Sequence, residues 1–396
     1  MRLALCNLVL ASVAVTATAQ ATYPVGSSLM SWRDVPGASS TRLDAYVMYP
    51  ATAAGVDQPV LPVSGGWPVV VFLHGFGLVG SDYHALGAKW AETGLVVVML
   101  QSGQWNYHEL RADALAAIPA LQIANTTPGS ALLGALDTSR IGLAGHSMGG
   151  GVAGLVLRRE VGYRCGIALA PVSPGSNVPR AIGVPFGLVV GTGDLVTPWQ
   201  AHAQPYYQAL AATGGMKFLY LLDGTCDHMN IVGLTGSLSG AVFTRTASVT
   251  AGFFGHLLRR DPFALEECVG PTAQAEPHLV SLAQSVVVPQ QWSAESLRLG
   301  TVARISVGAE PGEAGIVAAD YLSLPFPTLY GALLVNPATA SIWTVGSVGQ
   351  ERRFDAWLDV PNQSSLVGMP VALQSFSSPV GQPITLGTAI QLQVVP

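Results

Sequence analysis

Charge is scarce in this sequence, and lysine is rarer still. Charged residues make up 10% of the 396 residues, and lysine occurs only as Lys89 and Lys217. Because no Lys or Arg run forms a basic patch, we expect neither nucleic-acid binding nor electrostatic docking on membranes. Hydrophobic residues make up 49%, which excludes a disordered chain and allows a large core. At this length the chain is expected to form two domains.

Long hydrophobic runs are also missing, since no stretch after residue 21 reaches the ~18 uninterrupted apolar residues of a membrane span. At the start, Arg2 precedes an apolar run over Leu3–Val15, and small residues at Ala-x-Ala spacing follow up to Ala21. This order is typical of a secretory signal peptide over residues 1–21. A membrane anchor is the alternative, but the run is too short to span a bilayer. We therefore expect an exported protein, extracellular or periplasmic, without an integral membrane segment after cleavage.

Cysteine is the next shortage, with four residues in the chain. No Cys-x-x-Cys pair and no two histidines at i, i+4 occur, so we expect no metal site. Without the leader, Cys165, Cys226 and Cys268 remain, an odd number that allows one disulfide and one free thiol. Cys165 begins a strand, and the helix over 244–260 is expected to carry Cys268 back to that edge. This favours a Cys165–Cys268 bridge, with Cys226–Cys268 as the alternative.

Short apolar runs alternate with helical patterns between residues 22 and 262. A β-branched run such as Pro68–Leu73 is typical of a strand buried on both faces. Helical spacing follows many of these runs, for example over Glu109–Gln122 and Thr244–Arg260. The alternation predicts an α/β fold with a doubly wound, mostly parallel sheet and helices on both faces. Residues 38–50 predict an antiparallel strand at the start of that sheet.

The pattern changes after residue 262. Residues 263–290 are rich in Pro, Glu, Gln and Ala, and we expect them to form a connector. Over 291–396 short alternating runs are separated by Pro and Gly, which predicts a small all-β, sandwich-like domain. The expected organisation is therefore a signal peptide over 1–21, an α/β domain over 22–262, a connector and a C-terminal β-domain.

One turn of the α/β domain carries the pattern of a catalytic nucleophile. Residues 145–149 read Gly-His-Ser-Met-Gly, follow a buried strand and open a helix, which is Gly-x-Ser-x-Gly in its required context. The glycines allow a sharp, strained turn that holds the serine hydroxyl above the sheet. We interpret Ser147 as a nucleophile, and a purely structural turn is the alternative.

A serine hydroxyl is a weak nucleophile unless a base activates it. Among eight histidines, His228 alone follows the last core strand and precedes the last helix. Its loop is therefore expected at the carboxyl edge that also carries Ser147. We expect His228 to be the base, against the alternative of a loop histidine without a partner. Structural, packing or surface roles fit the others: His74, His84, His108, His146, His202, His256 and His278.

The acid that orients the base should lie at the same edge. Asp194 ends the fifth strand there and completes the chain order Ser, Asp, His. Asp223 and Asp227 are nearer to His228 in sequence, but they lie on its own strand end and loop. They are poorly placed to reach the far ring nitrogen, so Asp194 is the predicted acid.

An oxyanion hole needs two backbone N–H donors. Met148 N–H, directly after the nucleophile, is expected to supply one. The second is expected from the turn over residues 74–77, where Phe76 N–H is the better candidate and Gly75 N–H the alternative.

These segments resemble the α/β-hydrolases of the bacterial cutinase and polyester hydrolase group over about residues 25–260. The elbow GHSMGGG matches that group's pattern, and so does segment 193–198 with the Ala-x-Pro-Tyr-Tyr helix after it. The oxyanion turn differs from the group's pattern, because it reads His-Gly-Phe where the group usually has Pro-Gly-aromatic. Val172 also differs, since it occupies a place where polyester-cleaving enzymes usually carry tryptophan. The loop over 226–230 is more similar to chlorophyllase and platelet-activating-factor acetylhydrolase relatives.

The resemblance implies hydrolysis of carboxylic esters through an acyl-enzyme, with an ester as the substrate and without a cofactor. The residues concerned are Ser147, Asp194 and His228 for the triad, Phe76 and Met148 for the oxyanion hole, and Val172, Leu195 and Val196 for the substrate cleft. A short-chain or platelet-activating-factor acetylhydrolase-like esterase is an alternative within the same class. A non-catalytic extracellular binding protein that kept a hydrolase scaffold is the alternative from another class.

Overall fold

The computed structural model describes most of the chain in two compact units, which are divided in the sequence after residue 287. The described residues are 22–158, 162–175, 177–210, 216–259, 261, 264–286, 290–292, 297–308, 314–320, 326–328, 331–333, 341–347, 353–378 and 385–396. The expected signal peptide over 1–21 lies outside them. Within the described parts, no helix combines the length and apolar character needed to cross a bilayer.

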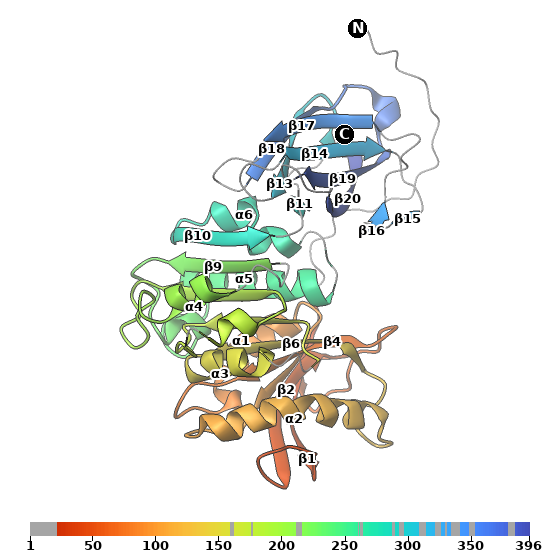
Figure 1. Ribbon diagram of the computed structural model, residues 1–396. Helices are drawn as coiled ribbons and strands as arrows, with labels where there is room; N and C mark the ends of the chain where they lie inside the picture. The colour runs from red at the N-terminus through yellow and green to blue at the C-terminus, as the bar shows by residue number, and fades with distance from the viewer. Residues whose placement is uncertain are drawn as a thin grey trace. The chain divides into compact units, whose positions relative to one another are not determined.

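The first unit is built on one mixed, mostly parallel sheet (Figure 1). In chain order its strands are β1 (Val25–Arg33), β2 (Arg42–Pro50), β3 (Gly55–Val56), β4 (Trp67–Leu73), β5 (Val96–Leu100), β6 (Leu136–His146), β7 (Cys165–Leu169), β8 (Phe186–Gly191), β9 (Met216–Leu222) and β10 (Leu279–Val286). Their order in space is β10-β9-β8-β7-β6-β4-β5-β2-β1-β3. Strands β4 to β9 pair in parallel, whereas β2 and β10 join antiparallel at the two ends. This confirms the predicted mostly parallel sheet.

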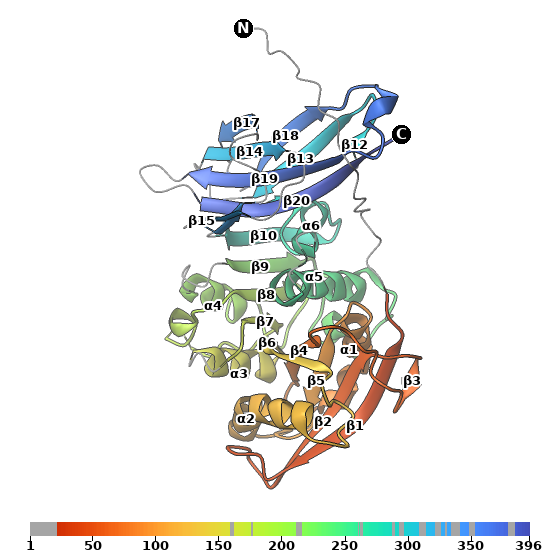
Figure 2. The ribbon, with the colours of Figure 1, turned by 90° about the vertical axis from the view of Figure 1, so that its right-hand side faces the viewer.

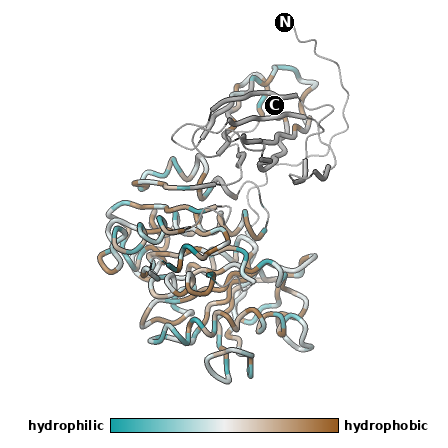
Figure 3. Tube along the Cα trace, viewed as in Figure 1, coloured by the Kyte–Doolittle hydropathy of each residue, from teal (hydrophilic) through white to brown (hydrophobic). Residues whose placement is uncertain are grey.

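Helices cover both faces of this sheet. They are α1 (His84–Ala91), α2 (Tyr107–Thr126), α3 (Met148–Leu157), α4 (Ala203–Ala209), α5 (Ala241–Leu258) and the short α6 (Pro271–Gln274). Helices α2, α3 and α4 lie on one face, and α1 and α5 lie on the other (Figure 2). Because both faces are covered, every residue of β4, β5, β7 and β8 is buried, and hydrophobic colour concentrates along the central strands (Figure 3).

The segment 263–290 does not act only as a connector, which corrects the sequence prediction. Within it, β10 pairs with β9, from Leu279 opposite Leu222 to Val286 opposite Met216. This pairing satisfies backbone groups that would otherwise stay exposed along the outer side of β9. The prediction failed because β10 is an edge strand with polar residues, so it lacks the continuous apolar run of the inner strands.

The predicted Cys165–Cys268 disulfide is also corrected, because Cys165, Cys226 and Cys268 are all free and buried. Helix α5 separates the two thiols. Its Phe254 lies against Gly142, the register neighbour of Cys165, whereas its Gly252 faces the one-turn helix η5 (Ala264–Glu267) that precedes Cys268. Residues 252 and 254 point to nearly opposite sides of a helix, so α5 lies between the two cysteines.

The described residues of the second unit are mainly strands. They are β11 (Gln290–Trp292), β12 (Leu297–Arg298), β13 (Val302–Gly308), β14 (Ala314–Asp320), β15 (Phe326–Thr328), β16 (Gly331–Leu333), β17 (Ser341–Ser347), β18 (Arg353–Asp359), β19 (Pro370–Ser378) and β20 (Thr385–Val395). Strands β11-β13-β18 and β12-β20-β19-β14-β17 form two sheets, and β15 pairs with β16. A separate all-β domain over 291–396 stays a prediction.

Candidate active site

Ser147 lies on a strained turn between β6 and α3. Its backbone has φ 54° and ψ −116°, a region that residues with a side chain rarely adopt. The turn is tight: a Cβ on Gly145 would lie 2.3 Å from the carbonyl oxygen of Gly149, and one on Gly149 would lie 2.1 Å from that of Leu73. Both positions therefore require glycine, and the predicted sharp elbow is present.

The structure brings together the three residues that the sequence selected as a triad. Nε2 of His228 lies 3.0 Å from Oγ of Ser147, and Nδ1 of His228 lies 2.7 Å from Oδ2 of Asp194. All three residues are buried. Asp194 follows β8 and His228 follows β9, so both loops lie at the carboxyl edge of the parallel strands, next to the end of β6.

The two other aspartates considered as the acid, Asp223 and Asp227, form hydrogen bonds with groups other than the ring of His228. Oδ2 of Asp223 lies 2.8 Å from Nδ1 of His278. Asp227 accepts the backbone N–H groups of Met229 and Asn230 at 2.8 Å each. Neither carboxylate is therefore available to orient His228.

Asp194 is held as a carboxylate by its own loop. Its Oδ1 accepts the backbone N–H groups of Val196 and Thr197 at 2.8 and 2.9 Å. Burial alone would raise the pKa of Asp194, but hydrogen bonds from His228 and from the backbone and hydroxyl of Thr197 lower it to about 2. An ionised Asp194 keeps a proton on Nδ1 of His228 and leaves Nε2 free to accept one from Ser147.

Thr197 belongs to this arrangement, although the sequence analysis missed it. Its hydroxyl lies 2.8 Å from Oδ2 of Asp194, 3.2 Å from Nδ1 of His228 and 3.0 Å from the carbonyl oxygen of Ala170. It thus connects the loops after β7, β8 and β9. The spacing Asp-x-x-Thr could have signalled it, since an aspartate often accepts N–H groups two and three residues later in such a turn.

The turn over residues 74–77 packs directly on the nucleophile, because a Cβ on Gly75 would lie 3.4 Å from Cβ of Ser147. Gly75 N–H donates to the hydroxyl of Tyr83 at 2.9 Å, so it is already used. Among the described residues, Phe76 N–H has no acceptor. Met148 N–H lies in the first turn of α3, where N–H groups lack intrahelical partners. Of the two predicted candidates in the turn, the geometry therefore favours Phe76.

Apolar side chains surround this edge of the sheet and form an exposed rim. The predicted cleft residues Val172, Leu195 and Val196 are all exposed, and Leu195 is 89% exposed. The backbone N–H of Val172 donates to the carbonyl oxygen of Ser147 at 2.9 Å, which places this part of the rim beside the nucleophile.

Trp105 is a rim residue that the sequence analysis did not select. Its ring contacts that of Phe76 edge-on, with centroids 5.0 Å apart, and both side chains are more than half exposed. The two loops are also joined by hydrogen bonds between Gly77 and Gln104, at 2.8 and 3.0 Å. Its position after β5, at the same edge as Ser147, is a signal that could have identified it.

No group of three His, Cys, Asp or Glu side chains in the described ranges is arranged to hold a metal ion.

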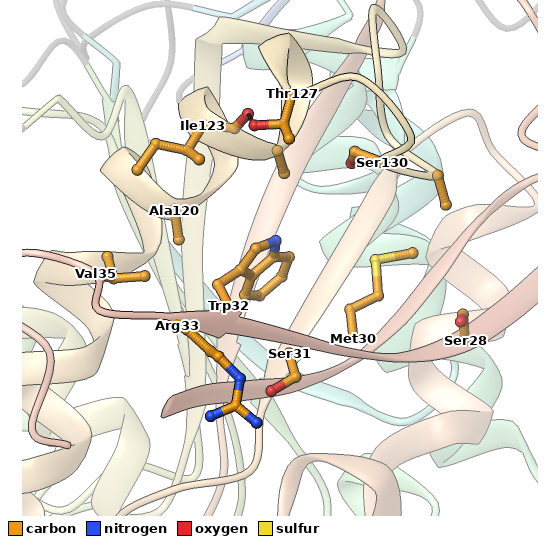
Figure 4. A pocket seen from close by; sticks show the side chains of 12 residues that line it. Ser28, Met30, Ser31, Trp32, Arg33, Val35, Ala120, Ile123, Thr127 and Ser130 are labelled. Atoms are coloured by element: carbon orange, nitrogen blue, oxygen red, sulfur yellow. Dashed lines mark hydrogen bonds between the residues drawn. The ribbon is translucent and has the colours of Figure 1, made fainter. Parts of the chain in front are cut away.

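A surface cavity of about 360 Å³ lies away from the triad, between β1 and α2, where Trp32 faces the α2 residues Ala120 and Ile123 (Figure 4). None of the three triad residues lines it.

Comparison with known proteins finds sequences that this chain is similar to. Residues 43–239 match the family model described as PET hydrolase-like. The chain is 26% identical over 204 residues to a bis(hydroxyethyl) terephthalate hydrolase of Streptomyces coelicolor, covering 51% of this chain and 64% of that protein. It is 28% identical over 151 residues to cutinase est1 of Thermobifida alba, covering 38% and 50%. It is 29% identical over 147 residues to cutinase 2 of Thermobifida cellulosilytica, covering 37% and 55%. The chain thus spans between half and two thirds of the length of these relatives.

Proposed function

We propose that the protein is a serine hydrolase of carboxylic esters, of the PET hydrolase-like group of α/β-hydrolases whose family model matches residues 43–239. The observation that carries the proposal is the hydrogen-bonded chain from Ser147 through His228 to Asp194. A strained nucleophile, a base at 3.0 Å and a buried carboxylate behind it are the parts that acyl transfer requires.

The proposed reaction has two steps that use the same groups. Oγ of Ser147 attacks the ester carbonyl carbon while Nε2 of His228 takes the hydroxyl proton. Negative charge develops on the carbonyl oxygen and is stabilised by the N–H groups of Phe76 and Met148. His228 then protonates the leaving alcohol, which leaves an acyl group on Ser147. Water, activated by the same imidazole, releases the acid and restores the hydroxyl.

The proposed substrates are small, soluble or short-chain esters with apolar acyl groups. The rim of Val172, Leu195 and Val196 offers apolar contact on an exposed edge. The relatives' printed names are those of a bis(hydroxyethyl) terephthalate hydrolase and of cutinases, which are names for ester-cleaving enzymes. We do not propose polymer cleavage, because Val172 occupies the place where polyester-cleaving enzymes usually have tryptophan.

The substrate proposal is tested by hydrolysis of p-nitrophenyl esters of increasing acyl length. We expect kcat/KM to be highest for short to medium chains, and to fall by several orders of magnitude in a Ser147→Ala variant. Absence of hydrolysis for every chain length by the folded protein would contradict the proposal and favour a non-catalytic binding protein on a hydrolase scaffold.

We further propose an exported protein whose leader over residues 1–21 is removed, and a C-terminal β-domain over 291–396. The order of Arg2, apolar run and small residues supports the first proposal. The strand pairings described after residue 290 support the second. The α/β domain is proposed to extend past residue 262 to the end of β10, because β10 is hydrogen-bonded to β9.

A further inference from the structure

Two buried side chains outside the triad connect its parts. The hydroxyl of Tyr83, at the end of the short helix η1 (Gly80–Tyr83), lies 2.8 Å from Nδ1 of His146. Nε2 of His146 lies 2.8 Å from the carbonyl oxygen of His228. Tyr83 also accepts the N–H of Gly75 at 2.9 Å. A continuous chain of hydrogen bonds therefore runs from the oxyanion turn through the elbow to the loop of the base.

The chemistry of the groups fixes the direction of each bond. The carbonyl oxygen of His228 can only accept, so Nε2 of His146 carries a hydrogen. Burial lowers the pKa of His146 to about 3, so the ring is neutral and its Nδ1 is an acceptor. The hydroxyl of Tyr83 therefore donates to Nδ1 and accepts the N–H of Gly75 with its oxygen. Each of the three donors in this series of hydrogen bonds, on Gly75, Tyr83 and His146, therefore has one acceptor.

The side chains of Tyr83 and His146 are buried, so a substrate does not contact them. The side chain of Tyr83 is fully buried and His146 is 1% exposed. The ring of His146 lies beside that of His228, with centroids 4.7 Å apart, and a Cβ on Gly75 would lie 3.2 Å from Nδ1 of His146. The three segments are packed closely enough that a shift in one displaces the others.

We propose that Tyr83 and His146 are positioning residues that fix the oxyanion turn and the catalytic imidazole relative to each other. The inference rests on the proposed function, because it assigns Phe76 N–H as an oxyanion donor and His228 as the base. At one end of the hydrogen-bonded chain, Gly75 precedes Phe76, and at the other end the acceptor is the backbone of the base His228. His146, between them, precedes Ser147. Catalysis depends on such distances, since a displacement of about 1 Å can cost ~10²-fold in rate.

The test is steady-state kinetics of Tyr83→Phe on a p-nitrophenyl ester that the wild type hydrolyses. The variant keeps the ring that packs against Phe72 but removes the hydroxyl. We expect kcat to fall roughly 10- to 100-fold while KM stays within about twofold, because neither Tyr83 nor His146 contacts substrate. The rate of phosphonylation of Ser147 by a fluorophosphonate should fall by a similar factor.

His146 provides a second pair of variants. His146→Gln can still donate an amide N–H toward the carbonyl oxygen of His228, whereas His146→Leu cannot. We expect the glutamine variant to retain more kcat than the leucine variant. The double variant Tyr83→Phe/His146→Leu should lose no more than His146→Leu alone, since the chain is already broken.

Tyr163→Phe is the matched control. Tyr163 is buried and donates to the carbonyl oxygen of Ala114, so its loss removes a similar buried hydrogen bond away from the triad. We expect it to lower the unfolding midpoint without changing kcat.

The outcomes separate this inference from the proposed function. The positioning role is overturned if Tyr83→Phe keeps kcat within twofold of wild type. It is also overturned if Tyr163→Phe loses as much kcat as Tyr83→Phe does. If Tyr83→Phe does not fold, equal kcat for His146→Gln and His146→Leu overturns it instead. An inactive, unlabelled wild-type protein overturns the proposed function and this inference together.

Discussion

The proposed nucleophile is one of the few non-glycine residues of the described chain that have a positive φ. Ser147 is held at φ 54° by bonds made outside its own turn: its N–H donates to Leu169 at 3.0 Å, and its carbonyl oxygen accepts from Val172 at 2.9 Å. The neighbouring strand β7 therefore keeps the elbow in place, and the hydroxyl is not part of that support. The side chain can be changed without loss of the turn.

Ser147→Ala should abolish ester hydrolysis while the protein stays folded. We expect kcat to fall by several orders of magnitude, with at most ~10³-fold acceleration over water left from the oxyanion hole. Activity on p-nitrophenyl acetate, together with the far-UV circular dichroism spectrum, is the measurement. Ser173→Ala, on the same edge after β7, is the control and should keep wild-type kcat. Activity of the Ser147→Ala enzyme within tenfold of wild type would show that another group is the nucleophile.

Asp194→Asn should remove part of the acid sensitivity of folding. The folded-state pKa of Asp194 is about 2, below its ordinary value of 3.8. A lowered folded-state pKa contributes stability above pH ~4, and the contribution is lost as pH falls through about 2. The advantage of wild type over the variant in free energy of unfolding should therefore shrink by roughly 2 kcal/mol between pH 5 and pH 2.

Urea unfolding at several pH values between 5 and 2 measures this difference. Ser147→Ala changes no carboxylate, so its difference from wild type should stay constant over the same range. An Asp194→Asn difference that is also constant would mean that Asp194 is not preferentially ionised in the folded state.

At the scale of elements, the strands that could be located from the sequence are those buried on both faces of the sheet. The inner strands are covered on both faces, so they read as continuous apolar runs and could be located from the sequence. The triad could be predicted because those runs fix which loops share the carboxyl edge. Strand β10 could not, because an edge strand mixes polar and apolar residues. Thr197 left a local signal in its spacing from Asp194. The Tyr83–His146 pair left none, because it joins segments 63 residues apart in the sequence.

A pair of truncations tests the role of β10. A protein ending at residue 287 should stay soluble and keep activity on small esters, because it retains the complete sheet. One ending at residue 262 should aggregate or fail to fold. It loses β10, exposes the edge of β9, and removes the buried residues Cys268, Val269 and Ala273.

Soluble expression and p-nitrophenyl acetate hydrolysis of the two truncated proteins are the measurements. Equal activity of both would mean that β10 contributes nothing to the hydrolase unit. Loss of activity in the longer protein would mean that the C-terminal residues support the hydrolase unit.

At the scale of the whole molecule, the chain joins an α/β unit with a strand-rich C-terminal part. The sequence was sufficient for the fold class of the first unit, because alternating strands and helices permit few topologies. The missing disulfide shows where such reasoning stops. Strand direction placed Cys165 and Cys268 toward one edge, but it could not reveal that α5 lies between them.

The central claim is that Ser147 is an activated nucleophile, and labelling with a fluorophosphonate tests it most directly. The account predicts one adduct per chain, located by peptide mass spectrometry on Ser147 and absent from the folded Ser147→Ala protein. Labelling should slow when a hydrolysable ester is present, because both compete for the same hydroxyl. A folded wild-type protein that stays unlabelled, or one labelled equally well after Ser147→Ala, would contradict the account.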